Sequence, residues 1–538
     1  MKKLSLLFLI IVIISCSKKE KVDTIIINAI IYTVNDNFEL AEALAIKDGK
    51  IIDVGTTSEI QSKYASTYVN DVKGKTIVPG FIDAHCHFYE LGLQQQKVDL
   101  TGTKSFDEVV QKIIDFQKEK NVSYITGRGW DQNDWEIKEF PTKDKLDELF
   151  PNIPVSITRI DGHALLANQT AIDLAGVTIN TPFSGGEILQ KEGKLTGVFI
   201  DNPMELIEIK IPKPSKKEQI KALKDAEKIC IDLGLTTVDD AGLSREVIEL
   251  IDSLQQAGEL KIRIYAMVSN TPKDVNYYLN KGIVKTDRLN VRSIKVYGDG
   301  ALGSRGAAMK KPYSDKHNHF GALLATPEDF MNISKQIAAS DYQMNSHAIG
   351  DSANYLLLKT YKKVLKGKTD RRWRIEHAQI IDKEDFKYFD NILPSVQPTH
   401  ATSDMYWAED RVGAERIKGA YAYKNLLTNY GKIALGTDFP IEKVSPFLTF
   451  YAAVARKDLN NYPENGFQME NALTRKETLK GMTIWAAFSN FEENEKGSIE
   501  VGKFADFIIL DKNIMEADAK EIPYINAEET YINGERVK

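Results

Sequence analysis

Eight short apolar runs, each ending in polar or small residues, are spaced along the middle of this 538-residue chain. Helical patterns separate several of them, for example at 216–233 and 327–340. Strands that alternate with helices predict a parallel sheet, and eight such units predict a TIM-like (β/α)8 barrel of the α/β class. The runs occupy residues 77–83, 235–239, 262–268, 293–297, 342–346, 373–376, 393–397 and 433–437.

The two ends of the chain carry β-rich segments of their own. Asp48-Gly49 and Asn533-Gly534 are hairpin-turn signals within such segments. Neither end is long enough to bury a core alone, and domain termini often lie close together. We therefore expect a composite β-sandwich domain from residues 23–77 and 486–538, with the barrel spanning 78–485.

The interval between the first two runs is too long for one loop and one helix. It contains further strand candidates at 122–127 and 154–159. We therefore expect an inserted subdomain after strand one, at approximately 93–225.

The N-terminus resembles a bacterial lipoprotein signal. Lys2 and Lys3 precede an apolar run at 4–14, which is too short to span a bilayer and fits a secretory signal. The run ends at Ser15-Cys16, as in a lipobox, so residues 1–15 are expected to be removed and Cys16 to be lipidated. The alternative is a plain signal peptide with an incidental cysteine. The lipobox interpretation predicts an exported, membrane-anchored protein of the cell envelope, and it leaves open which membrane holds the anchor.

Composition narrows the class of function. The chain has 70 Lys and Arg against 76 Asp and Glu, for a net charge of −6, so it has no basic surplus for binding nucleic acid. Three cysteines in a chain of this length do not form a disulfide framework. Only eight histidines are present, so the position of each one is informative.

Ligand-type side chains stand at or near the ends of five of the eight predicted strands. Two histidines at positions i and i+2 of an extended chain share a face and can converge on one ion. A lone lysine pointing into a barrel would carry a costly buried charge. Active sites of barrels lie at the carboxyl ends of the strands, where imidazole and carboxylate groups suit zinc and similar metals. The residues are His85, His87, Lys295, His347, His377 and Asp438.

Four motifs carry a resemblance to a known family. They are Pro79-Gly80-Phe81-Ile82-Asp83-Ala84-His85-Cys86-His87, the segment 161–168 (DGHALLAN), the segment 298–308 (GDGALGSRGAA) and the segment 497–506 (GSIEVGKFAD). Taken in this order, they resemble the amidohydrolase superfamily, and most closely its YtcJ-like branch, amidohydrolase family 3, which is related to N-substituted formamide deformylases. The resemblance covers about residues 23–537.

The resemblance implies a role for each ligand-type residue. His85 and His87 would bind one divalent metal, and His347 and His377 a second, with zinc as the expected ion. Lys295 would be carboxylated and bridge the two ions, which turns a buried cation into an anionic ligand. Asp438 would contact the first metal and act as the general base.

These roles predict hydrolysis of a non-peptide amide-type C–N bond in a small molecule, an N-acyl or N-formyl amine. A cyclic amide, a lactone or a deamination substrate would use the same ligands, so those reactions remain alternatives. A lipid-anchored binding protein without turnover is a third interpretation, and it predicts a broken ligand set. The oligomeric state cannot be read from the pattern.

Substrate-side residues are harder to assign. His163, Arg305 and His400 are the candidates, because the first two lie in family-like motifs and the third follows strand seven. Trp130 and Trp135 in the insertion are expected either to form an aromatic lid or to pack in the core of that subdomain.

Overall fold

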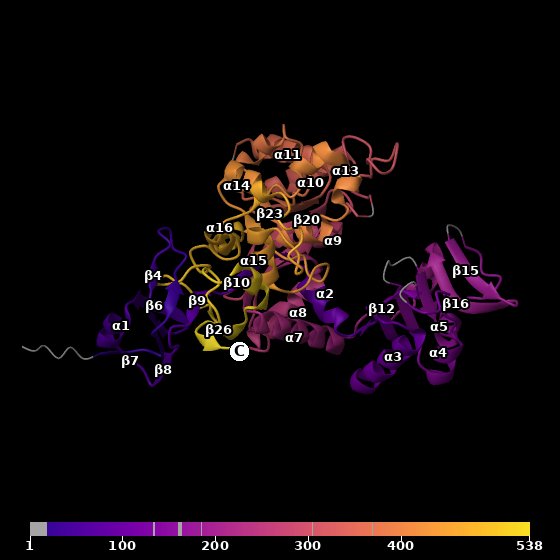
Figure 1. Cartoon of the computed structure of the whole chain (residues 1–538), viewed down its shortest axis with the longest axis horizontal. Coiled ribbons are helices and arrows are strands. Elements are labelled where there is room, and N and C mark those ends of the chain that lie inside the picture. The colour runs from indigo at the N-terminus through magenta and orange to yellow at the C-terminus, as the bar shows by residue number, and fades with distance from the viewer. Residues whose placement is uncertain (1–18, 133–134, 160–163, 184–185, 304, 368–369) are drawn as a thin grey trace, which may run out of the picture.

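The computed structural model of the chain describes residues 19–132, 135–159, 164–183, 186–303, 305–367 and 370–538. A parallel barrel stands at its centre (Figure 1), and its strands are hydrogen-bonded to their neighbours in chain order. The predicted α/β barrel is confirmed. Its strands are β10 (Phe81–Cys86), β17 (Leu235–Leu243), β18 (Arg263–Ser269), β20 (Leu289–Tyr297), β21 (Gln343–Ala348), β22 (Arg374–His377), β23 (Leu393–Val396) and β24 (Ala434–Leu435).

The last and first strands of the barrel meet through the segment that follows β24. The backbone N–H of Asp438 donates to the His85 carbonyl at 2.8 Å, and the N–H of His87 donates to the Phe439 carbonyl at 2.8 Å. Gly436 permits this approach, because a Cβ there would lie 2.5 Å from the His85 nitrogen. The contact brings residues from opposite ends of the barrel sequence to one edge.

The first predicted strand differs from the observed arrangement. The run 77–83 is divided at Gly80 between two strands in different sheets: β9 (Thr76–Pro79) belongs to a terminal sheet, and β10 begins at Phe81. A Cβ on Gly80 would lie 2.3 Å from the Thr236 side chain. The chain thus passes from one sheet to the other at a residue that has no room for a side chain.

Helices cover the outside of the barrel, and several begin at a side-chain cap. Ser215 and Glu218 form a capping box at the start of α7, and Thr326 and Asp329 form one at the start of α10. The covering helices are α2 (Phe88–Gln94), α7 (Lys216–Asp232), α8 (Arg245–Gln256), α9 (Pro272–Lys281), α10 (Pro327–Ala338), α11 (Asp351–Leu365), α12 (Pro398–Asp404), α13 (Ala408–Arg416), α14 (Tyr423–Tyr430), α15 (Pro446–Ala455), α16 (Arg475–Gly481) and α17 (Ile484–Ser489).

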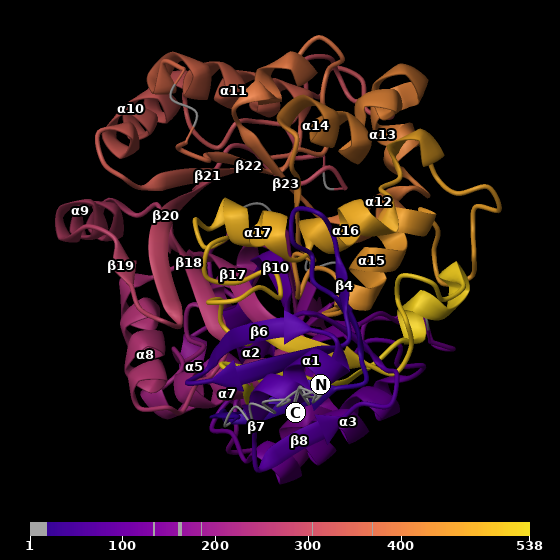
Figure 2. The same ribbon diagram turned by 90° about the vertical axis from the view of Figure 1, so that its left-hand side faces the viewer.

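Strands from both ends of the chain pair in one mixed sheet, ordered β27-β26-β25-β9-β3-β4. A second sheet, ordered β6-β5-β2-β8, packs against it through a shared apolar core that includes Ile26, Ile46 and Phe507. The indigo and yellow segments lie side by side in Figure 2. The bounds are β2 (Thr24–Ile27), β3 (Ile30–Tyr32), β4 (Leu40–Ala41), β5 (Ala43–Lys47), β6 (Lys50–Gly55), β8 (Tyr68–Asp71), β25 (Phe507–Leu510), β26 (Ala527–Ile532) and β27 (Glu535–Arg536).

A separate lobe follows the first barrel strand and projects to one side in Figure 1. It has its own apolar core, which includes Trp130 and Trp135, so these side chains pack inside the lobe rather than forming a lid. The lobe contains β11 (Val98–Asp99), β12 (Ile125–Trp130), β13 (Val155–Arg159), β14 (Ala164–Ala167), β15 (Gly186–Lys191), β16 (Lys194–Asp201), α3 (Phe106–Lys120), α4 (Asp144–Leu149) and α5 (Gln169–Ala175).

Within the described residues, no helix has the length and apolar character needed to cross a membrane.

Candidate metal centre

The structure brings the six predicted ligand-type residues together at the carboxyl ends of the barrel strands. His85 is fully buried, and its Nε2 lies 3.1 Å from Lys295 Nζ and 3.6 Å from Asp438 Oδ1. The Nε2 of His87 lies 3.2 Å from the same Asp438 oxygen. Residues 353 positions apart in the chain (438 − 85) therefore form one polar cluster.

His347 and His377 lie beside this group. Their ring centroids are 4.5 Å apart, and the His377 ring is 4.8 Å from that of His85. Burial, together with the positive charge of Lys295, lowers the pKa of His347 to about 3, and burial also lowers the pKa of His377. Both rings are therefore neutral at pH 7, which is the form that binds metals.

Two backbone conformations at the site are unusual. His377 has φ +71° and Asp438 has φ +62°, in the left-handed region that non-glycine residues seldom adopt. Such conformations cost of order 1–3 kcal/mol each and persist where the surrounding structure imposes them. His377 is the last residue of β22, and Asp438 lies in the segment after β24, so both conformations occur where the ligand-type side chains gather.

Lys295 lies within β20 and its side chain is buried. Burial lowers the pKa of its amine to about 8, although the nearby carboxylates of Glu376 and Asp438 favour the charged form. More of the amine is therefore neutral near pH 7 to 8 than in an ordinary lysine, and the neutral amine is the nucleophilic form.

Glu376 is a site residue that the sequence analysis missed. Its Oε2 accepts a hydrogen bond from His85 Nδ1 at 2.7 Å, and both side chains are fully buried. The bond leaves Nε2 of His85 directed at Lys295 and Asp438. One signal was present in the sequence: Arg374 and Glu376 are charged residues at alternate positions of a predicted strand, so both point to one face.

Glu442 was missed as well. His400 follows β23, and its Nε2 lies 3.3 Å from Asp438 Oδ2 while its Nδ1 lies 3.1 Å from Glu442 Oε1. Burial lowers the pKa of His400, but the hydrogen bonds to the two carboxylates outweigh it and raise the pKa to about 10. Burial would raise the pKa of Asp438, but its bonds to His400 and His87 hold that pKa well below its usual range. No sequence pattern distinguished Glu442.

Asp299 organises the loop after β20. Its carboxylate accepts backbone N–H bonds from Ala308 (2.8 Å), Ile349 (3.0 Å) and Gly350 (2.8 Å), and one oxygen lies 3.5 Å from His347 Nε2. Burial raises its pKa to about 7 against the effect of these bonds. Asp299 therefore ties the 298–308 motif to the strand end that carries His347.

The remaining predicted residues stand apart from the cluster or outside the described structure. Arg305 donates to Asp315 from Nε (3.0 Å) and Nη2 (2.8 Å), in the loop that follows β20. His163 and Cys16 lie outside the described residues. Among the predicted substrate-side residues, only His400 contacts the cluster in the described structure.

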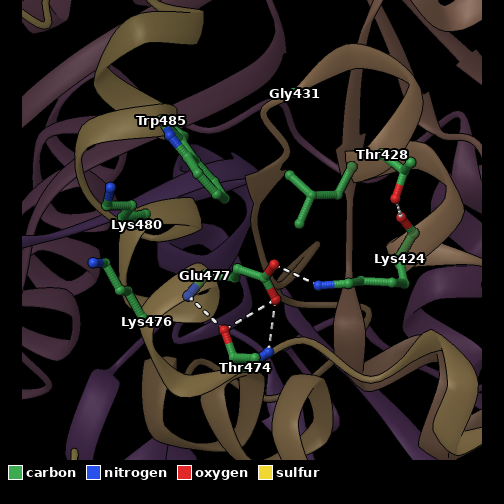
Figure 3. Close-up of a pocket in the computed structure, with 9 residues that line it drawn as sticks. Lys424, Thr428, Gly431, Thr474, Lys476, Glu477, Lys480 and Trp485 are labelled. Carbon is green, nitrogen blue, oxygen red and sulfur yellow. Dashed lines mark hydrogen bonds and ion pairs between the residues drawn. The ribbon is translucent and has the colours of Figure 1, made fainter. Parts of the chain in front are cut away.

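A pocket of about 520 Å³ lies elsewhere, between α14, α16 and α17 (Figure 3). Its lining includes Lys476, Lys480 and Trp485, while Glu477 is bound by Lys424 and Thr474. Gly431, also in the lining, comes just before β24 begins at Ala434. The pocket therefore lies towards the amino ends of the strands, at the other end from the metal-type ligands.

The donor set at the cluster fits divalent metal ions. Ligand atoms of His85, His87 and Asp438 lie within 4.8 Å of one another, as do those of His377, His400 and Asp438. His377 Nδ1 is buried with no hydrogen-bond partner among the described residues. Imidazole and carboxylate donors gathered in this way are typical of zinc and related metals, and a metal ion is a partner that would satisfy the buried His377 nitrogen.

Comparison with known proteins agrees with this geometry. The chain is 30% identical to a protein of Bacillus subtilis (strain 168) named YtcJ, over 94% of this chain and 98% of that one. It is 24% identical to the N-substituted formamide deformylase of Arthrobacter pascens, over 95% and 97% of the two chains. An uncharacterised metal-dependent hydrolase of Pyrococcus horikoshii has a similar structure, with a TM-score of 0.78 and 29% identity over 92% of this chain and 99% of that one. The model of the amidohydrolase family matches residues 69–538, and the chain belongs to that family.

Proposed function

We propose that this protein hydrolyses a non-peptide amide-type C–N bond in a small molecule, an N-acyl or N-formyl amine. The observation that carries the proposal is the Asp438 carboxylate, which lies within 3.6 Å of the Nε2 atoms of His85, His87 and His400. The formamide deformylase relative supports an amide substrate. A binding protein without turnover would not need this complete set of ligand-type side chains.

Zinc is the proposed ion. Its proposed ligands are His85, His87, Lys295, His347, His377 and Asp438. When bound, divalent metal ions supply the Lewis acidity that lowers the pKa of water to roughly 7 and polarises a carbonyl oxygen. Two ions would be held by these residues, with Lys295 contributing as a carboxylated amine. Its lowered pKa supports this assignment, because carboxylation joins a neutral amine to carbon dioxide with loss of one proton.

Asp438 is the proposed general base. Its low pKa keeps it ionised and able to accept a proton from water as the water oxygen adds to the amide carbon. The same proton passes to the nitrogen as the C–N bond breaks. The products are a carboxylic acid and an amine, and Asp438 returns to its starting state.

We propose further that the protein is exported and anchored to a membrane of the cell envelope through lipidated Cys16. The support is the short apolar run ahead of Ser15-Cys16 in the sequence. Lipidation would hold the barrel at a membrane surface without a transmembrane helix.

The decisive experiment measures metal content per chain by elemental mass spectrometry in the parent and in Lys295→Ala. About two equivalents in the parent and fewer in the variant are expected. The parent is then screened for release of amine from N-formyl and N-acyl amines, with Asp438→Asn as the comparison. An Asp438→Asn enzyme that turns over a verified substrate at the parent rate would refute the mechanism.

A further inference from the structure

His400 is oriented like the histidines proposed to bind the first metal. In His85, His87 and His400 alike, Nδ1 faces an acceptor: Glu376 Oε2 at 2.7 Å, the Ala241 carbonyl at 3.1 Å and Glu442 Oε1 at 3.1 Å. In all three, Nε2 faces Asp438, at 3.6, 3.2 and 3.3 Å. An acceptor on one ring nitrogen is what fixes a metal-binding histidine for coordination through the other.

The two oxygens of Asp438 serve different neighbours. Oδ1 faces His85 and His87, whereas Oδ2 faces His400. The ligand atoms form two sets that share only Asp438, and all atoms within each set lie within 4.8 Å of one another. One set contains His85 and His87, and the other contains His377 and His400.

In the second set, one ring nitrogen of His377 has no hydrogen-bond partner in the described structure. This nitrogen, Nδ1, is buried, and the ring centroid of His377 is 6.0 Å from that of His400. By contrast, His347 Nε2 lies 3.5 Å from both the Gly300 carbonyl and Asp299. His347 Nε2 thus has two polar atoms at 3.5 Å, whereas His377 Nδ1 has no hydrogen-bond partner among the described residues.

We infer that His400, held by Glu442, is a ligand of the second divalent metal together with His377 and Asp438, and that the ion displaces the proton that Asp438 and Glu442 stabilise on the His400 ring. This inference rests on the proposed metal-dependent function, and it adds a residue of α12, the helix that follows strand seven, to that site. Glu442 is a positioning residue, because it contacts His400 rather than the ion. Ser403 supports it by donating to Glu442 Oε1 at 2.6 Å.

The test uses the full chain, stripped of metal and reloaded with Zn²⁺ or Co²⁺. Bound zinc is counted by elemental mass spectrometry, zinc affinity is measured by competition with a chelator, and the ligand set is followed by the visible absorption of bound Co²⁺. His400→Ala is expected to lose one zinc equivalent or to change the Co²⁺ spectrum. Glu442→Gln is expected to weaken zinc binding 10- to 100-fold, as is typical when the partner of a ligating histidine is removed.

Two controls make the result specific. His317→Ala removes an exposed imidazole from a loop and should leave the zinc count and the Co²⁺ spectrum unchanged. His85→Ala tests the first metal, and thermal melting establishes that each variant is folded. If His400→Ala melts below the temperature of the assay, Glu442→Gln decides the question.

The outcomes separate the two proposals. If His85→Ala loses metal while His400→Ala and Glu442→Gln match the parent in zinc count, affinity and spectrum, His400 is not a ligand and only the inference fails. A changed KM in the His400 variant would then point to a substrate contact. If the parent binds neither Zn²⁺ nor Co²⁺, the metal-dependent function and the inference both fail.

Discussion

Glu376 Oε2 and His85 Nδ1 are 2.7 Å apart inside the barrel, and neither side chain has any exposed surface. The pair joins β22 to β10 and leaves His85 Nε2 facing Lys295 and Asp438. Nearby, Arg374 binds Asp239 at 3.0 Å, so charged residues fill the barrel beneath the cluster. The orientation of a proposed metal ligand thus depends on a carboxylate from across the barrel.

Replacing Glu376 with Gln should weaken metal binding by roughly 10- to 100-fold, because an amide is a poorer acceptor than a carboxylate for the His85 N–H. Chelator competition on the reloaded protein measures the change. Glu384→Gln alters an exposed carboxylate and serves as the matched control. Equal affinity in Glu376→Gln and the parent would show that this bond does not support the metal.

Glu492 should control stability at acid pH. It is buried between Lys285 and Lys496, at 2.7 Å from each. Burial alone would raise its pKa, but the two lysines lower it from an ordinary 4.5 to about 2. The unfolded chain therefore binds the proton more readily, so this contribution to stability is complete above pH 4.5 and is lost as the pH falls towards 2.

Glu492→Gln should accordingly cost about 3 kcal/mol of unfolding free energy at pH 7, because it leaves two lysines without their buried partner. The difference from the parent should narrow between pH 4.5 and pH 3, as measured by urea unfolding. Glu495→Gln removes a more exposed partner of Lys285 and should cost less than about 1 kcal/mol. A Glu492→Gln deficit that stays constant over this pH range would contradict the assignment.

The two cysteines of the barrel should be unreactive in the folded protein. Cys86 and Cys230 are fully buried free thiols, and burial raises the pKa of both well above the ordinary range. A chain that begins at Ser17 should therefore react negligibly with a disulfide reagent such as DTNB when native. It should release two equivalents of chromophore per chain in guanidinium. Rapid labelling of the native chain would disprove this.

Cys16→Ser should release the protein from the membrane fraction of a bacterial host, since the serine cannot carry the thioether-linked lipid. Cell fractionation and immunoblotting provide the measurement. Cys230→Ser is the matched control and should remain with the membranes. Persistence of Cys16→Ser in that fraction would exclude a lipid anchor at this position.

Much of the fold was predictable from local pattern. The eight apolar runs correspond to barrel strands because each strand is buried by helices outside and side chains within, which leaves a continuous apolar signature. The exception was 77–83, which is divided at Gly80, and no local pattern shows that Thr236 leaves no room for a side chain there.

For the site, chain order and strand position alone were enough to select His85, His87, Lys295, His347, His377 and Asp438, because barrel topology brings all carboxyl strand ends to one face. Glu442 required the tertiary structure, and so did the pairing of Glu376 with His85, although the charge of Glu376 inside a predicted strand is visible in the sequence. Glu376 meets His85 across 291 positions and Glu442 meets His400 across 42. Hydrogen bonds between distant positions depend on strand register and barrel closure, which arise only when the whole sheet has formed.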